Sequence, residues 1–127
     1  MLPYEIIGLI LSYTENIYDI IIENEEYRSI INKYSLLFHI DLSNKLITDN
    51  DLILFKRVYA IDLSSRIEIT DKGLEYLKGV HTINLSNCIY ITDKGLEYLK
   101  GVHTIDLSNC NQITNKGCEY LKGSHIA

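Results

Sequence analysis

One segment returns along this chain every 22 residues, and that interval constrains the fold more than any other feature. Residues 69–90 read ITDKGLEYLKGVHTINLSNCIY, residues 91–112 repeat them with few changes, and residues 113–127 begin a further copy, ITNKGCEYLKGSHIA. A fixed period of this length predicts small structural units that stack in a row, each burying its apolar side chains against its neighbours. We therefore expect a solenoid.

Two weaker copies precede the near-identical ones and extend the array toward the N-terminus. The turns begin near four apolar residues, Leu37, Val58, Val80 and Val102. The first turn is one residue shorter than the others because it lacks a loop residue between Ser43 and Thr48. The repeats thus cover residues 37–127, whereas residues 1–36 do not share the period and are expected to form a separate unit.

Each turn carries the pattern of a short strand and the pattern of a helix. Apolar and polar residues alternate at 83–85, as expected of a half-buried strand, whereas Leu74 and Leu77 are three residues apart and share one helix face. Thr70 precedes the helical stretch as a predicted N-cap, and Gly79 lies just past its end. Stacked turns of this kind predict an α/β solenoid with parallel strands on the concave face and helices on the convex face.

The repeat resembles the cysteine-containing class of leucine-rich repeats. Cys88 and Cys110 stand at the position that gives this class its name, and the resemblance implies a buried, reduced cysteine ladder. It also implies a curved solenoid segment that binds proteins on its concave face. Lys45 and Arg66 occupy the cysteine position in the first two turns, so we expect the ladder to be less regular there.

The N-terminal unit starts LPYEIIGLILSY, with Pro near a helix start and an apolar stripe at helical spacing behind it. This start resembles the F-box, a segment that docks onto the Skp adaptor of cullin-RING (SCF-type) ubiquitin ligases while a following repeat domain holds the substrate. The resemblance implies adaptor contacts at six residues, Leu2, Pro3, Ile6, Ile7, Ile10 and Leu11. It predicts a substrate-recruiting subunit with an unidentified protein target.

A second interpretation of residues 1–36 stays open. A solenoid must cover its first repeat, and a helical cap would show the same apolar stripes. The protein would then be a leucine-rich-repeat interaction scaffold with no part in ubiquitin transfer. Binding to a purified Skp-type adaptor distinguishes the two interpretations.

Charge and composition argue against several other classes of function. The net charge is −5, and the chain has no cluster of Lys and Arg such as nucleic-acid binding requires. No apolar run is long enough to span a bilayer, and the cysteines form no C-x-x-C pair. We expect a protein of the cytoplasm, or of the nucleus, that binds neither nucleic acid nor membrane.

Repetition explains the residues that could suggest a chemical site. His81 and His103 stand 22 residues apart, as do Cys88 and Cys110, so each pair is expected to stack in a column whatever its role. No loop holds ligands at tetrahedral spacing, and no Ser-His-acid set or phosphate-binding Gly-rich loop stands apart from the repeat. We expect no metal, no cofactor and no catalytic activity.

The strand pattern nominates a binding surface, because residues that flank the buried Ile and Leu face outward. Three columns result: His39, Ala60, Thr82 and Thr104; Asp41, Asp62, Asn84 and Asp106; Ser43, Ser64, Ser86 and Ser108. The middle column is acidic, and our hypothesis is that it contacts a polar or basic segment of a partner. The alternative is that these are merely solvated strand residues.

Residues 124–127 stand where the next strand would begin, without the polar capping unit that a solenoid normally has. An unprotected strand edge invites pairing. We expect this edge to be frayed, covered by a partner, or self-associating.

Overall fold

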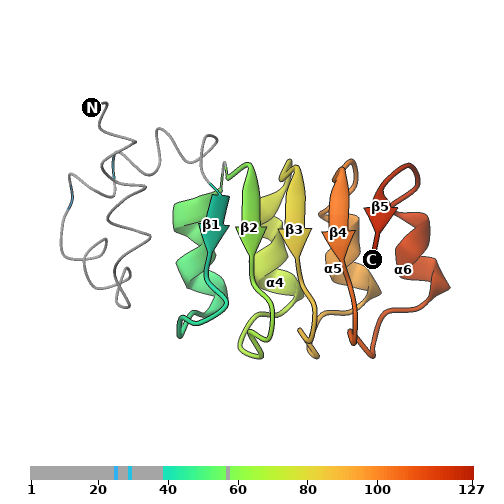
Figure 1. Cartoon of the computed structure of the whole chain (residues 1–127), viewed down its shortest axis with the longest axis horizontal. Coiled ribbons are helices and arrows are strands. Elements are labelled where there is room, and N and C mark those ends of the chain that lie inside the picture. The colour runs from blue at the N-terminus through green and yellow to red at the C-terminus, as the bar shows by residue number, and fades with distance from the viewer. Residues whose placement is uncertain (1–24, 26–28, 30–38, 57) are drawn as a thin grey trace.

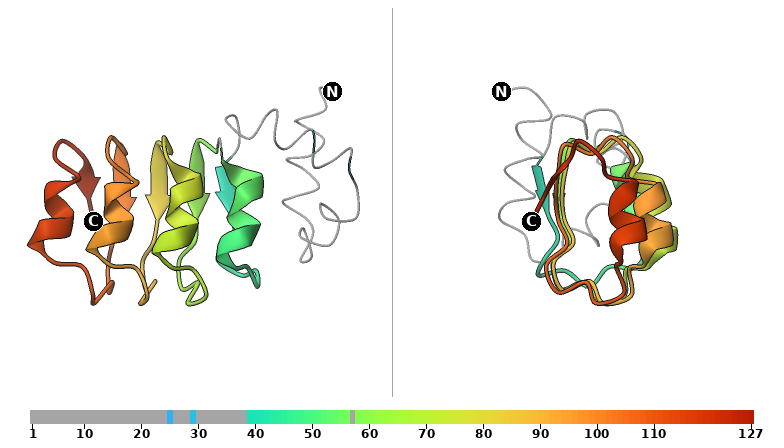
Figure 2. Two further views of the ribbon diagram at one scale, coloured as in Figure 1. Left: turned by 180° about the vertical axis from the view of Figure 1, so that it is seen from behind. Right: turned by 90° about the vertical axis from the view of Figure 1, so that its right-hand side faces the viewer.

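The computed structural model describes residues 25, 29, 39–56 and 58–127. Within them, short parallel strands form one sheet in chain order: β1 (His39–Asp41), β2 (Ala60–Asp62), β3 (Thr82–Asn84), β4 (Thr104–Asp106) and β5 (His125–Ile126). The helical elements are η2 (Asp49–Phe55), α4 (Asp71–Leu74), η3 (Glu75–Leu77), α5 (Asp93–Glu97) and α6 (Asn115–Glu119). The strands lie side by side, and the helices cover one face of the sheet (Figures 1 and 2). The predicted arrangement of a parallel sheet on one wall and helices on the other is confirmed.

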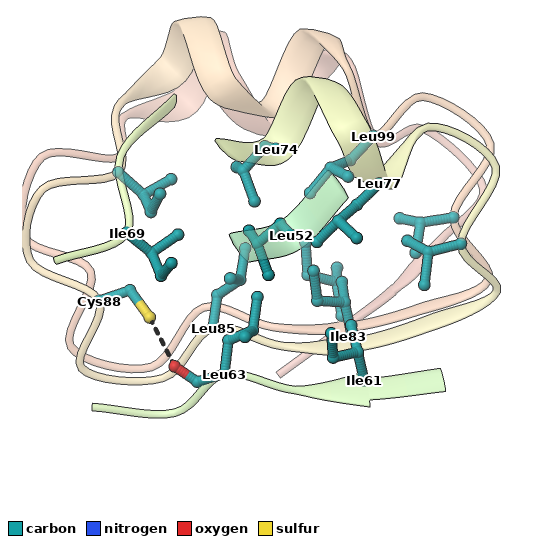
Figure 3. Packing of buried hydrophobic residues seen from close by; sticks show 14 of the residues in the cluster. Leu52, Ile61, Leu63, Ile69, Leu74, Leu77, Ile83, Leu85, Cys88 and Leu99 are labelled. Carbon is teal, nitrogen blue, oxygen red and sulfur yellow. Dashed lines mark hydrogen bonds between the residues drawn. The ribbon is translucent and has the colours of Figure 1, made fainter. Parts of the chain in front are cut away.

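The core is a continuous column of aliphatic side chains between the sheet and the helices. Leu63 and Leu85, just past β2 and β3, and Leu74 and Leu77, on the helical side, have no exposed surface. Figure 3 shows these residues meeting between the two walls. Because each turn repeats the same positions, every inner turn packs against the turns on both sides, as solenoids require.

Carboxylates also join neighbouring turns. The Asp71 side chain accepts hydrogen bonds from the backbone N–H of Thr92 at 2.8 Å and from its hydroxyl at 2.5 Å. Asp49 does the same for Thr70, and Asp93 for Thr114. The threonines are N-caps as expected, since the Thr92 hydroxyl also accepts from the N–H of Lys94. Each such pair bonds one turn to the next.

The helices are shorter than the sequence pattern predicts. Regular α-helix stops at Leu74 and Glu97 in the two central turns, and the first turn has the 3₁₀ helix η2 instead. Gly79 and Gly101 therefore lie several residues past the α-helical end, where φ angles of 86° and 87° place them in the left-handed region. Glycine adopts that region without steric cost, which allows the chain to turn back toward the sheet.

The cysteine ladder forms where the sequence places it. The Cys88 thiol donates to the carbonyl of Leu63 at 3.1 Å (Figure 3). In the next turn, the Cys110 thiol donates to the carbonyl of Leu85 at 3.0 Å. Arg66, at the cysteine position of an earlier turn, instead sends its guanidinium to the carbonyl of Lys45 at 2.6 Å. The expected irregularity at this corner is confirmed.

The C-terminal residues form a short strand. His125 and Ile126 pair with Thr104 and Ile105 of β4, and the N–H of Ala127 donates to the carbonyl of Ile105 at 2.9 Å. The expectation of a frayed end is therefore wrong for this structure. Self-association through the edge of β5 stays a prediction.

Candidate interaction surface

The sheet face opposite the helices carries the columns expected from the repeat. His39 pairs in register with Ala60, and the same row continues through Thr82 and Thr104. A second row in register contains four polar residues, Asp41, Asp62, Asn84 and Asp106. Both rows line an open groove of about 400 Å³ along the sheet. The residues nominated from the sequence for partner binding therefore lie together on one surface.

One residue of the first row differs from the expectation. Ala60 is only 4% exposed, although the strand pattern places it outward. Its single methyl group lies between the larger side chains of His39 and Thr82, which pair with it on either side. Ala60 thus forms part of the floor of the groove and not a raised contact.

The carboxylates of the second row are held in place by the turns that follow the strands. The N–H of Ser43 donates to Asp41 at 2.9 Å, and the N–H of Ser108 donates to Asp106 at the same distance. Hydrogen bonds from these serines lower the pKa of both carboxyl groups from the ordinary value of 3.8, so both are ionised at neutral pH. Asn84 accepts from Ser86 in the same way, so an amide replaces the carboxylate without changing the turn.

The serine column has a different role from the one expected. Ser43, Ser64, Ser86 and Ser108 donate their backbone N–H groups to the side chain two residues earlier. None of them lines the groove. The serines orient the second row and lie at its border.

A ladder of rings borders the groove on its other side. Tyr59, His81 and His103 stack with centroid separations of 4.5 Å and interplanar angles of 12°. His39 and His125 extend the ladder at the two ends in tilted contacts of 5.7 and 5.3 Å. Stacking of the two histidines was expected from their spacing. The part played by Tyr59 was missed, although it stands 22 residues before His81.

The imidazoles also bond to the first row. Nδ1 of His81 lies 2.8 Å from the Thr82 hydroxyl, and Nδ1 of His103 lies 2.9 Å from the Thr104 hydroxyl. These bonds fix the plane of each ring and leave its Nε2 as the remaining polar atom. Each of these two rings is thus bonded to a threonine of the groove floor.

The described residues contain no group of three or more His, Cys, Asp or Glu side chains that could hold a metal ion. Cys88 and Cys110 are buried, and Cys118 is half-buried. Loss of hydration on burial raises the pKa of the Cys88 thiol to about 11, which keeps it protonated and unreactive at neutral pH. Among the described helices, none has the length and apolarity to cross a membrane.

The six residues nominated for the adaptor, Leu2, Pro3, Ile6, Ile7, Ile10 and Leu11, lie outside the described residues. The predicted boundary between residues 1–36 and the repeats also lies outside the described residues.

A leucine-rich-repeat family model matches residues 102–122, which run from just before β4 to just past α6. No F-box model matches the chain. No curated protein matches it. Together with the parallel sheet and the outer helices, the match indicates an α/β fold like that of leucine-rich repeats, which generally bind protein partners.

Proposed function

We propose that the protein is a non-catalytic interaction module that holds a partner protein on the open face of its sheet. The observation that carries this proposal is the groove, where polar side chains in register stand over a floor fixed by the buried core. None of the described residues that line the groove is Lys or Arg, which favours a protein over a nucleic acid as partner. The repeat match supports the same class of function.

We further propose that residues 1–36 dock onto a Skp-type adaptor, so that the protein recruits its partner to a ubiquitin ligase in the cytoplasm or nucleus. The support is the LPYEII start, joined directly to repeats that could hold a substrate. The alternative, a repeat scaffold with an N-terminal cap, needs no adaptor.

Blocking the groove tests the first proposal. Thr82→Arg with Thr104→Arg places two bulky side chains over the floor, and we expect capture of the partner to be lost. A matched control, Asn50→Arg with Asn111→Arg, adds the same charge at exposed positions outside the groove. Equal capture by the groove variant and the control would show that the partner binds elsewhere.

Direct binding to a purified Skp-type adaptor tests the second proposal. We expect the full chain to bind and Leu2→Ala with Pro3→Ala to lose binding. Leu46→Ala is the control, because Leu46 is an 86% exposed leucine within the repeats. A wild-type chain that does not bind the adaptor would leave the capped scaffold as the function.

A further inference from the structure

The groove has two unlike edges and a floor of small side chains. Ala60, Thr82 and Thr104 lie along the floor, so an occupant can approach the sheet closely. The acidic row forms one edge, and the ring ladder, bonded to the floor threonines through His81 and His103, lies along the opposite side. Both edges run across the strands, from one repeat to the next. An occupant that contacts both edges over several repeats must therefore be elongated along the solenoid.

The carboxylates of the acidic edge differ in whether a basic side chain of the same protein lies near them. Lys45 lies near Asp41 and contributes to the lowered pKa of that carboxyl group. Arg66 directs its guanidinium to the carbonyls of Lys45 and Ser64. No basic side chain contributes to the lowered pKa of Asp106, which depends on Ser108. The groove edge at Asp106 thus offers negative charge that a basic group of a partner can neutralise.

The ring edge offers one polar atom for each repeat. Because Nδ1 of His81 and of His103 is bonded to a threonine, Nε2 is the ring nitrogen left to bond a partner. The rings follow one another at 4.5 Å. This row of rings can bond to the backbone carbonyls of a partner segment. The segment must be extended, because in a helix or sheet its carbonyls would already be hydrogen-bonded.

Spacing on the acidic edge restricts the conformation of the occupant. Asp62 and Asp106 stand two strands apart in register, with Asn84 between them. Neighbouring strands are about 4.8 Å apart, so the two carboxylates are separated by roughly 9.6 Å. A polyproline-type segment brings every third side chain to the same side after about 9.3 Å, and its backbone carbonyls remain free to accept hydrogen bonds.

We infer that the groove holds an extended, polyproline-type segment of a partner protein with Arg or Lys side chains three residues apart. The basic side chains bond to Asp62 and Asp106, and the backbone of the segment lies along the ring ladder. The inference rests on the proposed function, since it specifies the part of the partner that the open sheet face receives.

The test uses the full chain, two basic peptides of equal charge and composition, and an acidic control peptide, (Glu-Pro-Pro)₄. In (Arg-Pro-Pro)₄ the arginines are three apart, whereas in Arg₄Pro₈ they are adjacent. Binding is measured by fluorescence anisotropy of labelled peptides. The buffer contains about 0.1 M salt, because this concentration largely screens long-range electrostatic attraction. We expect the spaced peptide to bind more tightly. Equal binding of the two peptides, or tighter binding of (Glu-Pro-Pro)₄, overturns the inference.

Two double variants separate the acidic edge from net charge. Asp62→Asn with Asp106→Asn should bind the spaced peptide about fivefold to tenfold more weakly, since two ion pairs at half-buried carboxylates are lost. The turns should persist, because Asn84 already makes the same bond to a following serine. Glu97→Gln with Glu119→Gln removes equal charge from exposed helix positions and should change nothing. Equal weakening in both variants overturns the inference.

A third variant tests the ring edge. His103→Phe keeps a ring in the stack but removes its nitrogens, so we expect weaker binding of the spaced peptide. Unchanged binding contradicts the backbone contact. If neither peptide binds while Thr82→Arg with Thr104→Arg still abolishes partner capture, the segment is wrong and the proposed function stands. If neither peptide binds and the Thr82→Arg with Thr104→Arg variant captures the partner normally, both the inferred segment and the proposed function are wrong.

Discussion

The α-helices α4, α5 and α6 each contain one glycine, and an added methyl group has its clearest consequence there. In an exposed helix, Gly→Ala stabilises by about 1 kcal/mol because alanine has the higher helix propensity. Gly95 is buried against the preceding turn. A Cβ there would clash with Oδ1 of Asp71 and lie only 2.9 Å from Cδ1 of Leu74. We predict that Gly95→Ala destabilises the protein, opposite to the propensity effect.

The size of the loss follows from what must move. Overpacking of this kind costs about 1–3 kcal/mol. If the Asp71 carboxylate shifts away instead, the bonds to the N–H and hydroxyl of Thr92 weaken, and hydrogen bonds to a charged group contribute about 1.5–3 kcal/mol each. After the propensity gain, we expect a net loss of about 1–3 kcal/mol in the free energy of unfolding.

Urea denaturation of the full chain measures this loss. For a domain of this size, a change of about 2 kcal/mol lowers the urea midpoint by roughly 1 M. In an Asp71→Ala background the same substitution should cost less, because the clashing oxygen is absent, and the double-mutant cycle should show coupling. A Gly95→Ala variant as stable as the wild type would refute the close approach of the turns. The same conclusion would follow if the losses in free energy of unfolding for Gly95→Ala and Asp71→Ala were additive in the double variant.

Leu74→Ala removes a fully buried side chain and should lower the free energy of unfolding by about 2–5 kcal/mol in the same urea assay. Iodoacetamide at neutral pH should modify Cys118 well before Cys88 in the folded protein, as followed by mass spectrometry; equal rates would contradict the burial that raises the Cys88 pKa to about 11. Hydrogen bonds from Thr114 lower the pKa of Asp93 below the ordinary 3.8, so its contribution to stability is present above that value and is lost as pH falls through the lower folded-state pKa. Thermal unfolding below pH 4 should therefore depend less on pH in Asp93→Asn, and an unchanged dependence would show that the bond is not formed.

The repeat itself made much of this architecture predictable. Residues that recur at a fixed interval must stack in columns, so the rows from Asp41 to Asp106 and the pairing of His81 with His103 followed from counting. Periodicity is sufficient for these features because identical turns occupy equivalent positions in a solenoid. The buried cysteine ladder was implied instead by the resemblance to cysteine-containing leucine-rich repeats, and its interruption at Arg66 by the departure from that pattern.

Features that depend on the distance between turns were not predictable. Thr92 is the N-cap equivalent to Thr70 in the next turn, but its bond to Asp71 of the preceding turn requires a particular separation of the helices. The same separation explains why position 95 is glycine, since a larger residue would clash with the preceding turn. Helix propensity alone would disfavour glycine at this position. Ala60 was misplaced because burial on a strand face depends on the size of its neighbours on adjacent strands, which alternation along one strand does not reveal.

Binding of a partner protein on the open face of the sheet can be tested directly. A photo-crosslinking amino acid at position 82, in the groove, tests it against the same residue at position 94, which is exposed on α5. The partner obtained by affinity capture is mixed with each labelled chain, irradiated, and analysed for covalent adducts. We predict adducts from position 82 and none from position 94. Adducts from position 94 alone would place the partner on the helices and contradict the account.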